Sequence, residues 1–192
     1  HLNSPLFLAV RTRHLATVKL LVEHGACIEM KHEMLSDSAL CVAVHEGSLE
    51  IATYLIAQGA NPDFQDERGD TPLMIACRKR FLRVLPLLLP RSSVDIVNMH
   101  QETALDILYS HQGFSRFFMQ VVLSFKPSYA NKEGTTILME LVKRGYATEL
   151  EQVLRYNVEL DAQDNEGNTA LFWAIKLNNI KCAEVLLRCG SN

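Results

Sequence analysis

The chain has 192 residues, of which 48% are hydrophobic and 21% are charged. That share of apolar residues is sufficient for a folded core and argues against intrinsic disorder. A formal net charge of −3 and a pI near 6.2 exclude a surface that as a whole attracts nucleic acid or anionic membrane.

The cysteines and the apolar runs bear on the compartment. There are five cysteines, an odd number without a CxxC pair, which indicates free thiols in a reducing compartment. We see no signal peptide at the start and no apolar run long enough to cross a bilayer. We therefore expect a cytoplasmic protein, with the nucleus as an alternative, and no membrane insertion.

A short pattern of Ser or Thr, a small or cyclic residue and an aliphatic residue recurs along the chain. It begins at Ser4, Ser38, Thr71, Thr103, Thr136 and Thr169, with spacings of 32 to 34 residues. A Ser or Thr hydroxyl accepts from a free backbone N–H at a helix start, and proline suits the following position. Each occurrence therefore predicts the start of a short helix.

A second apolar helix follows each first helix after a chain-breaking residue. The predicted breakers are Gly47, Gly113 and Gly145, with Arg13, Arg80 and Asn178 at related places. Gly25, Gly59 and Gly190 are predicted to end second helices in a left-handed conformation. Residues 66–69, 131–134 and 164–167 are predicted to form tight turns before the next start.

The repeated segments resemble a known family. Residues 4–9 (SPLFLA) and 71–76 (TPLMIA) are similar to the ankyrin signature TPLHLA, and residues 55–60 (LIAQGA) to its LLxxGA ending. HEAT and TPR repeats fit the period of about 33 residues less well. The resemblance covers essentially the whole chain and implies an all-α ankyrin-repeat solenoid of helix–turn–helix units joined by β-turn-like fingers.

The register of the repeats predicts the domain organisation. We expect one domain over residues 1–192, with approximate repeats 1–34, 35–67, 68–99, 100–132, 133–165 and 166–192. Neither end shows the polar face that a terminal repeat needs, so we expect a segment of a longer protein.

Several positions depart from the repeat pattern. We expect irregular structure at the second helix of repeat three, where Pro86 lies in the first turn, at the turn over residues 31–37, and in repeat four. Glu140 and Trp173 both stand where the signature has a core leucine. We predict backbone N–H groups or a hydroxyl as partners of Glu140, with Lys143 or Arg144 as second choice, and a core position for Trp173.

The resemblance places the first helices and the turn tips on a concave surface. Of twelve positions near the ends of the first helices, six are Lys or Arg, two are His, and one, Glu46, is acidic. Such a row would steer and bind an acidic or phosphorylated segment. The alternative is that these side chains only solvate the helix ends. The predicted partner-binding residues are Arg11, His45, Phe64, Arg68, Arg78, Lys79, Arg80, His100, His111, Tyr129, Lys143, Arg144 and Lys176.

Signatures of catalysis are absent from the sequence. We find no GxSxG, HExxH, GxxxxGK[ST] or GxGxxG, and no metal-ligand spacing among His and Cys. Nucleic acid is disfavoured because the basic row lacks regular aromatic interleaving. We therefore predict a non-catalytic protein-interaction module without cofactors, acting as an adaptor, scaffold or targeting unit. The alternative is an intramolecular regulatory domain that controls a neighbouring catalytic or channel domain.

Overall fold

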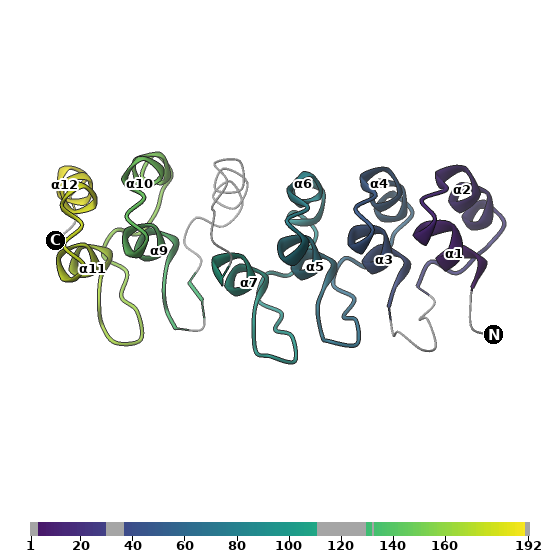
Figure 1. Cartoon of the computed structure of the whole chain (residues 1–192), viewed down its shortest axis with the longest axis horizontal. Helices are drawn as coiled ribbons and strands as arrows, with labels where there is room; N and C mark the ends of the chain where they lie inside the picture. Colours follow the sequence, from purple (N-terminus) through teal and green to yellow (C-terminus); the bar gives the residue numbers. More distant parts are fainter. Residues whose placement is uncertain (1–3, 30–36, 111–129, 132, 191–192) are drawn as a thin grey trace. The chain divides into compact units, whose positions relative to one another are not determined.

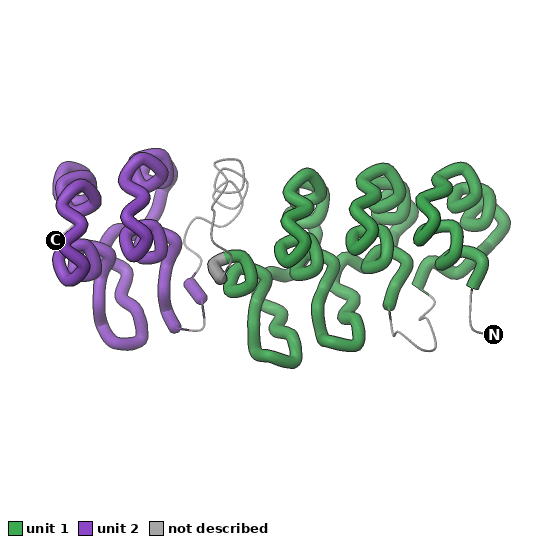
Figure 2. Tube along the Cα trace, viewed as in Figure 1, with its two compact units in different colours: residues 1–111 green, residues 112–192 purple. Residues whose placement is uncertain are grey.

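The computed structural model describes residues 4–29, 37–110, 130–131 and 133–190. The chain divides into two compact units, His1–His111 and Gln112–Asn192, each of which is considered by itself (Figure 2). Within the described ranges the secondary structure is helical, apart from an isolated bridge between Ala130 and Thr136. The predicted all-α class is confirmed.

In both units the helices come in pairs, and the first helix of one pair packs against the first helix of the next (Figure 1). Unit 1 contains α1 (Pro5–Arg11) with α2 (Leu15–Glu23), α3 (Ala39–His45) with α4 (Leu49–Ala57), α5 (Pro72–Lys79) with η1 (Leu82–Val84) and α6 (Leu85–Leu88), and then α7 (Ala104–Ser110). Unit 2 contains α9 (Ile137–Lys143) with α10 (Ala147–Val153), and α11 (Ala170–Lys176) with α12 (Ile180–Arg188).

The first helices start at the predicted caps. At five starts the hydroxyl oxygen accepts from the backbone N–H three residues later, at 3.1 to 3.4 Å. These caps are Ser38, Thr71, Thr103, Thr136 and Thr169. Each bond satisfies a donor that the helix itself leaves free. Ser4 makes no such bond at the start of α1.

The turns between paired helices require left-handed backbone. Gly47 and Gly145 have φ angles of 71° and 73°, while Arg13, Arg80 and Asn178 have 58°, 55° and 56°. Residues other than glycine seldom adopt this region, so the tight connection determines the conformation at these three positions. The predicted breakers are confirmed, except for Gly113, which lies outside the described residues.

Each of the four fingers with a described turn is closed by one short polar side chain, which we call the finger head. The finger heads are Asp66, Asn98, Asn131 and Asp164. In each, Oδ1 accepts from the N–H groups two and four residues later, at 2.8 to 3.0 Å. The backbone N–H of each finger head also donates to the carbonyl four residues later. The predicted tight turns are thus confirmed.

Neighbouring fingers approach each other closely through their backbones. The N–H of Met99 donates to the carbonyl of Arg68 at 3.0 Å, and in unit 2 the N–H of Asn165 donates to Glu133 at 3.0 Å. A Cβ added at Gly69 would come within 2.9 Å of the Met99 nitrogen. Gly69 is therefore needed for the finger contact as well as for its φ of 74°.

The core of each unit repeats the same positions. Leu6, Leu40 and Leu73 in unit 1, and Leu138 in unit 2, each expose 1% of their surface. The second helix of repeat three is irregular, because a 3-10 turn leads into α6, which has only four residues. Pro86 stands in its first turn, as predicted. The turn over residues 31–37 lies outside the described residues except for Asp37, and in repeat four the described part contains α7, while residues 111–129 are outside it.

A pair of glycine substitutions tests the finger contact. Gly69→Ala and Gly47→Ala share the cost of positive φ, about 1 kcal/mol, but at Gly47 an added Cβ meets no atom within 4 Å. We expect Gly69→Ala to lower the free energy of unfolding by a further 1 to 3 kcal/mol or so. Urea unfolding followed by far-UV circular dichroism measures both variants, and equal losses would contradict the finger contact.

Candidate functional site

The cationic side chains at the ends of the first helices differ in their exposure. Arg11, His45, Arg78, Lys79 and Lys176 are exposed, whereas Lys143 and Arg144 are half-buried. Their ability to bind a partner depends on which of them already has a partner within the protein.

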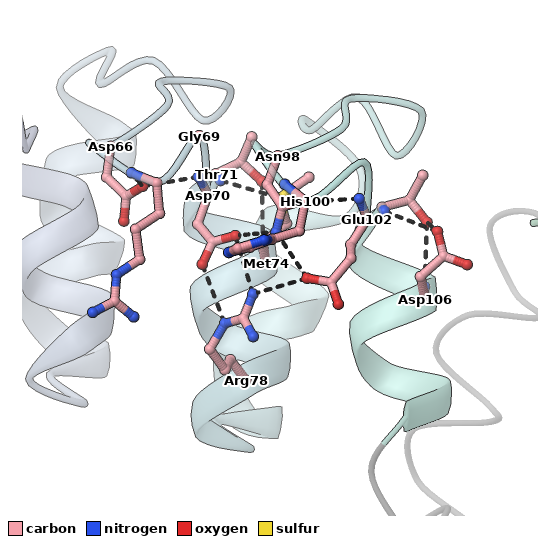
Figure 3. A network of polar contacts seen from close by, with 12 residues as sticks. Asp66, Gly69, Asp70, Thr71, Met74, Arg78, Asn98, His100, Glu102 and Asp106 are labelled. Carbon is pink, nitrogen blue, oxygen red and sulfur yellow. Dashed lines mark hydrogen bonds and ion pairs between the residues drawn. The ribbon is translucent and has the colours of Figure 1, made fainter. Parts of the chain in front are cut away.

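Arg78 is held by two carboxylates from consecutive fingers (Figure 3). Its Nε and Nη2 donate to Asp70 at 3.2 and 3.3 Å, and Nη2 also donates to Glu102 at 3.3 Å. Asn98 Nδ2 donates to the same two carboxylates, at 2.8 and 3.0 Å. Asp70 is only 3% exposed, so Arg78 compensates a buried charge and is not available as a free cation.

The contacts of the network shift the pKa values of Glu102 and Arg78. The hydrogen bond from Asn98 is the main cause that lowers the pKa of Glu102, and Arg78 acts in the same direction. Burial alone would lower the pKa of Arg78, but its bonds to Asp70 and Glu102 raise it overall. Both charges are therefore favoured in the folded state.

A hollow of about 490 Å³ opens beside this network, and we call it the unit 1 hollow. It is lined by Asp37, His45, Asp66, Glu67, Arg68, Asp70, Ile75, Arg78 and Lys79. Four of these residues are acidic and three are Lys or Arg, so the lining carries both charges. Burial raises the pKa of Asp66, whose Oδ1 accepts from the N–H groups of Arg68 and Asp70.

The acidic residues of the network could have been predicted from the sequence, because they stand directly before the N-caps of the first helices. The residue directly before each N-cap lies eight positions ahead of a residue at or next to the end of the first helix. Asp70 contacts Arg78 and Thr135 contacts Lys143 in this way, at 3.2 and 3.3 Å. In unit 1 the residues before the caps are Asn3, Asp37, Asp70 and Glu102, and in unit 2 they are Thr135 and Asn168. Acids therefore precede three of the four first helices of unit 1, whereas neutral side chains precede both first helices of unit 2.

In unit 2 the lysines at the ends of α9 and α11 lie beside Trp173. The indole Nε1 donates to the finger head Asp164 at 2.9 Å, and the residue is half-buried, so the predicted core position is wrong. The ammonium nitrogens of Lys143 and Lys176 lie 4.3 and 4.4 Å from the ring centroid. Trp173 leaves the core because its ring nitrogen needs an acceptor, which Asp164 supplies.

Glu140 is likewise outside the core. Arg144 Nε donates to its carboxylate at 2.6 Å, and the Glu140 side chain is 16% exposed. The partner is thus the second choice of the sequence analysis, because a residue four positions along the same helix reaches Glu140 more readily than a neighbouring repeat.

The remaining predicted residues occupy different environments. Arg68, Arg80 and His100 are exposed, and Phe64 is half-buried. Phe64 accepts a weak hydrogen bond from the buried Cys41 thiol through its backbone carbonyl, at 3.7 Å. His111 and Tyr129 lie outside the described residues.

Groups able to do chemistry do not converge among the described residues. Those residues hold no cluster of three or more His, Cys, Asp or Glu side chains that could bind a metal ion. Burial raises the pKa of Cys41 and Cys77 to about 12, so neither thiol is a ready nucleophile. No helix in the described part of the chain is long and apolar enough to cross a membrane.

Comparison with known proteins identifies the repeat. The profile "Ankyrin repeats (3 copies)" matches residues 1–66, 40–117 and 116–192. The ankyrin repeat domain of Bcl-3 superposes with a TM-score of 0.79 at 22% identity, covering 99% of this chain and 87% of that one. An ankyrin repeat domain from Acinetobacter baumannii AYE gives 0.78 at 22% identity and 98% coverage of each chain. The predicted ankyrin-repeat solenoid is confirmed.

Sequence relatives are much longer proteins. Neurogenic locus notch homolog protein 1 of Homo sapiens is 24% identical over 178 residues, which is 92% of this chain and 6% of that protein. Ankyrin repeat domain-containing protein SAT10 of Stachybotrys chartarum is 32% identical over 162 residues, or 81% of this chain and 8% of that protein. The chain thus spans a small part of these relatives.

Two neighbouring cations should respond differently to substitution. Arg78→Gln removes the partner of a buried carboxylate, and we expect a loss of about 1 to 2 kcal/mol in the free energy of unfolding, since Arg78 is partly exposed. Lys79→Gln should change stability by less than about 0.5 kcal/mol. Urea unfolding compares the two, and similar values for both would contradict a structural role of Arg78.

The lowered pKa of Glu102 predicts a pH dependence. A carboxylate whose pKa falls on folding stabilises the protein above its unfolded value, here 4.5, and this contribution is lost as the pH falls through the folded value. We therefore expect the protein to be more stable than Glu102→Gln at neutral pH and the difference to vanish in acid. Unfolding at a series of pH values measures this, and a constant difference across 4.5 would refute it.

Proposed function

Because this chain belongs to the ankyrin-repeat family, whose members generally bind other proteins, we propose that it is a non-catalytic interaction module that receives a segment of a partner protein in the unit 1 hollow. Family and fold are generally non-catalytic, in line with the high pKa of its buried thiols. Adaptor, scaffold and targeting roles all use such a surface.

The observation that carries the proposal is the unit 1 hollow itself. Its lining comes from Asp37 before α3, from the end of α3, from one finger and from α5, so it is built by two successive repeats. A concave site with converging polar groups at a junction of structural elements is a common binding site. Since Arg78 is engaged by Asp70 and Glu102, the exposed residues Arg68 and Lys79 are the cations that remain for a partner.

The charges of the lining specify the partner segment. Arg68 and Lys79 have no ion-pair partner among the described residues, and they favour an acidic or phosphorylated side chain. Glu67 is also exposed and favours a polar or basic residue beside that group. The partner segment is therefore polar, with acidic groups opposite the two cations. Because the thiols of all five cysteines are free, we place the module in the cytoplasm or nucleus.

The second candidate is regulation of a neighbouring domain in a longer polypeptide. It is favoured by the length of the relatives, of which this chain spans 6 to 8% in the cases above. The docked segment would then belong to the same polypeptide, and deletion of the module would change the activity of that protein without loss of a separate partner.

Selection of displayed random peptides on the immobilised protein tests the first candidate. We expect selected peptides to be enriched in Asp and Glu and to bind at least tenfold more weakly to Arg68→Glu/Lys79→Glu, since two attractive charges become repulsive. Affinity for the protein should fall with added salt. Lys181→Glu on α12, exposed and not among the residues that line the hollow, is the matched control. Undiminished binding to the double variant would refute the hollow as the binding site.

A further inference from the structure

The ends of α9 and α11 carry an arrangement that the repeat fold does not require. Three residues take part, Trp173, Lys143 and Lys176, and we call them the indole–lysine cluster. Both ammonium nitrogens lie within 4.4 Å of one ring centroid. Each ammonium is attracted by the ring, but the two like charges repel each other.

The cluster is held in place by the finger that precedes α11. Asp164 accepts from the backbone N–H groups of Glu166 and Asn168, and its other oxygen accepts from the Trp173 indole. The Lys143 ammonium donates to the Thr135 hydroxyl at 3.3 Å. Asp164 thus fixes the indole ring. The ring and the Thr135 hydroxyl together fix the Lys143 ammonium. Binding loses less entropy when the binding groups are ordered beforehand.

The positive charge of the cluster is compensated only in part, by the Asp164 carboxylate that accepts from the indole. Neither Lys143 nor Lys176 has a carboxylate within ion-pair distance among the described residues, and the residues before the caps, Thr135 and Asn168, are neutral. Glu140, the carboxylate nearest to Lys143 in the sequence, and Asp164, which holds the indole, are already engaged. Glu140 accepts from Arg144, and Asp164 accepts from the finger and from the indole.

The cluster is also open to solvent. Lys176 is exposed, and Phe172 beside it exposes 46% of its surface, while Lys143 and Trp173 are half-buried. An incoming anion can therefore reach the Lys176 ammonium from solvent, and the Lys143 ammonium lies beside the same ring. An anion bound at this exposed position keeps part of its hydration, so its desolvation cost is modest.

From these contacts we infer that the indole–lysine cluster binds the phosphoryl group of a phosphorylated side chain on a partner protein. A phosphomonoester carries nearly two negative charges and three acceptor oxygens, which match two separate ammonium donors. A single carboxylate offers one charge and two oxygens. The inference rests on the proposed interaction function and assigns the phosphorylated part of the partner to unit 2.

Other anionic partners fit the cluster less well. A membrane surface needs several more basic residues to bind measurably, since each contributes only about 1 kcal/mol. Single-stranded nucleic acid needs a series of aromatic platforms, whereas Trp173 is the sole tryptophan of the chain and Phe172 its only aromatic neighbour in α11.

Because the chain has a single tryptophan, its fluorescence reports directly on this cluster. The probes are the tripeptide acetyl-Gly-phosphoserine-Gly-amide, its Glu and Ser counterparts, and inorganic phosphate, each titrated at constant ionic strength. We expect a saturable change of Trp173 emission with the phosphopeptide, an affinity at least tenfold weaker for the Glu peptide, and no response to the Ser peptide. Phosphate alone should saturate too, because the phosphoryl group is what is recognised.

Charge-removing variants make the test specific. Lys143→Gln and Lys176→Gln should each weaken phosphopeptide binding about tenfold, since each removes one charge-assisted hydrogen bond. Lys181→Gln, exposed on α12 and outside the cluster, should leave it unchanged. Circular dichroism verifies that the variants are folded.

The outcomes separate this inference from the proposed function. A response that never saturates, or one that persists in both lysine variants, would overturn the phosphoryl site and leave the lysines as cover for the indole. Peptide selection on the unit 1 hollow is a separate measurement in a different unit. Its failure together with a saturable phosphate response would instead overturn the hollow and retain the cluster.

Discussion

The finger heads are the constraint on which the rest of the molecule depends. One carboxylate or amide oxygen accepts two backbone N–H groups and thereby closes a five-residue loop, at Asp66, Asn98, Asn131 and Asp164 alike. A loop without such an acceptor would leave donors unpaired in a part of the chain that forms neither helix nor sheet. The closed loop delivers the next Ser or Thr to its capping position. It also brings neighbouring fingers close enough for backbone hydrogen bonds, at an approach that leaves no room for a Cβ at Gly69 or Gly134.

The same loop influences the charge at the ends of the first helices. Its last residue stands before the N-cap and, as seen for Asp70 and Thr135, can reach the cation eight residues later. The local sequence therefore decides whether a helix-end cation is neutralised. Asp70 neutralises Arg78 and makes it part of the network described above. Thr135 leaves the charge of the Lys143 ammonium in place and only fixes its position. The two units share one backbone plan but present different electrostatics to a partner.

The sequence predicted those features that depend on nearby residues. Caps, turns and left-handed positions follow from local chemistry and recur every 33 residues or so, which is why even Arg13, Arg80 and Asn178 could be placed. The basic face could not be judged in this way. Arg78 meets Glu102 across 24 positions and Asn98 meets Asp70 across 28, so these contacts appear only when repeats stack. A count of the cations along the helix ends therefore includes Arg78 as a free charge, although the stacked repeats pair it with carboxylates.

Trp173 is a second residue whose environment the register of the repeat does not predict. Its register matches a leucine of the repeat signature, and a purely apolar side chain there would have joined the core. An indole also carries an N–H donor, which at this position is met by Asp164, so the ring stays at the edge of the core, half-buried. Its face then becomes available to Lys143 and Lys176. A substitution that only enlarged a core position would cost stability, whereas this one adds a polar anchor and a cationic surface. For that reason, the departure from the repeat signature at Trp173 is the position on which the proposed phosphoryl site of unit 2 depends.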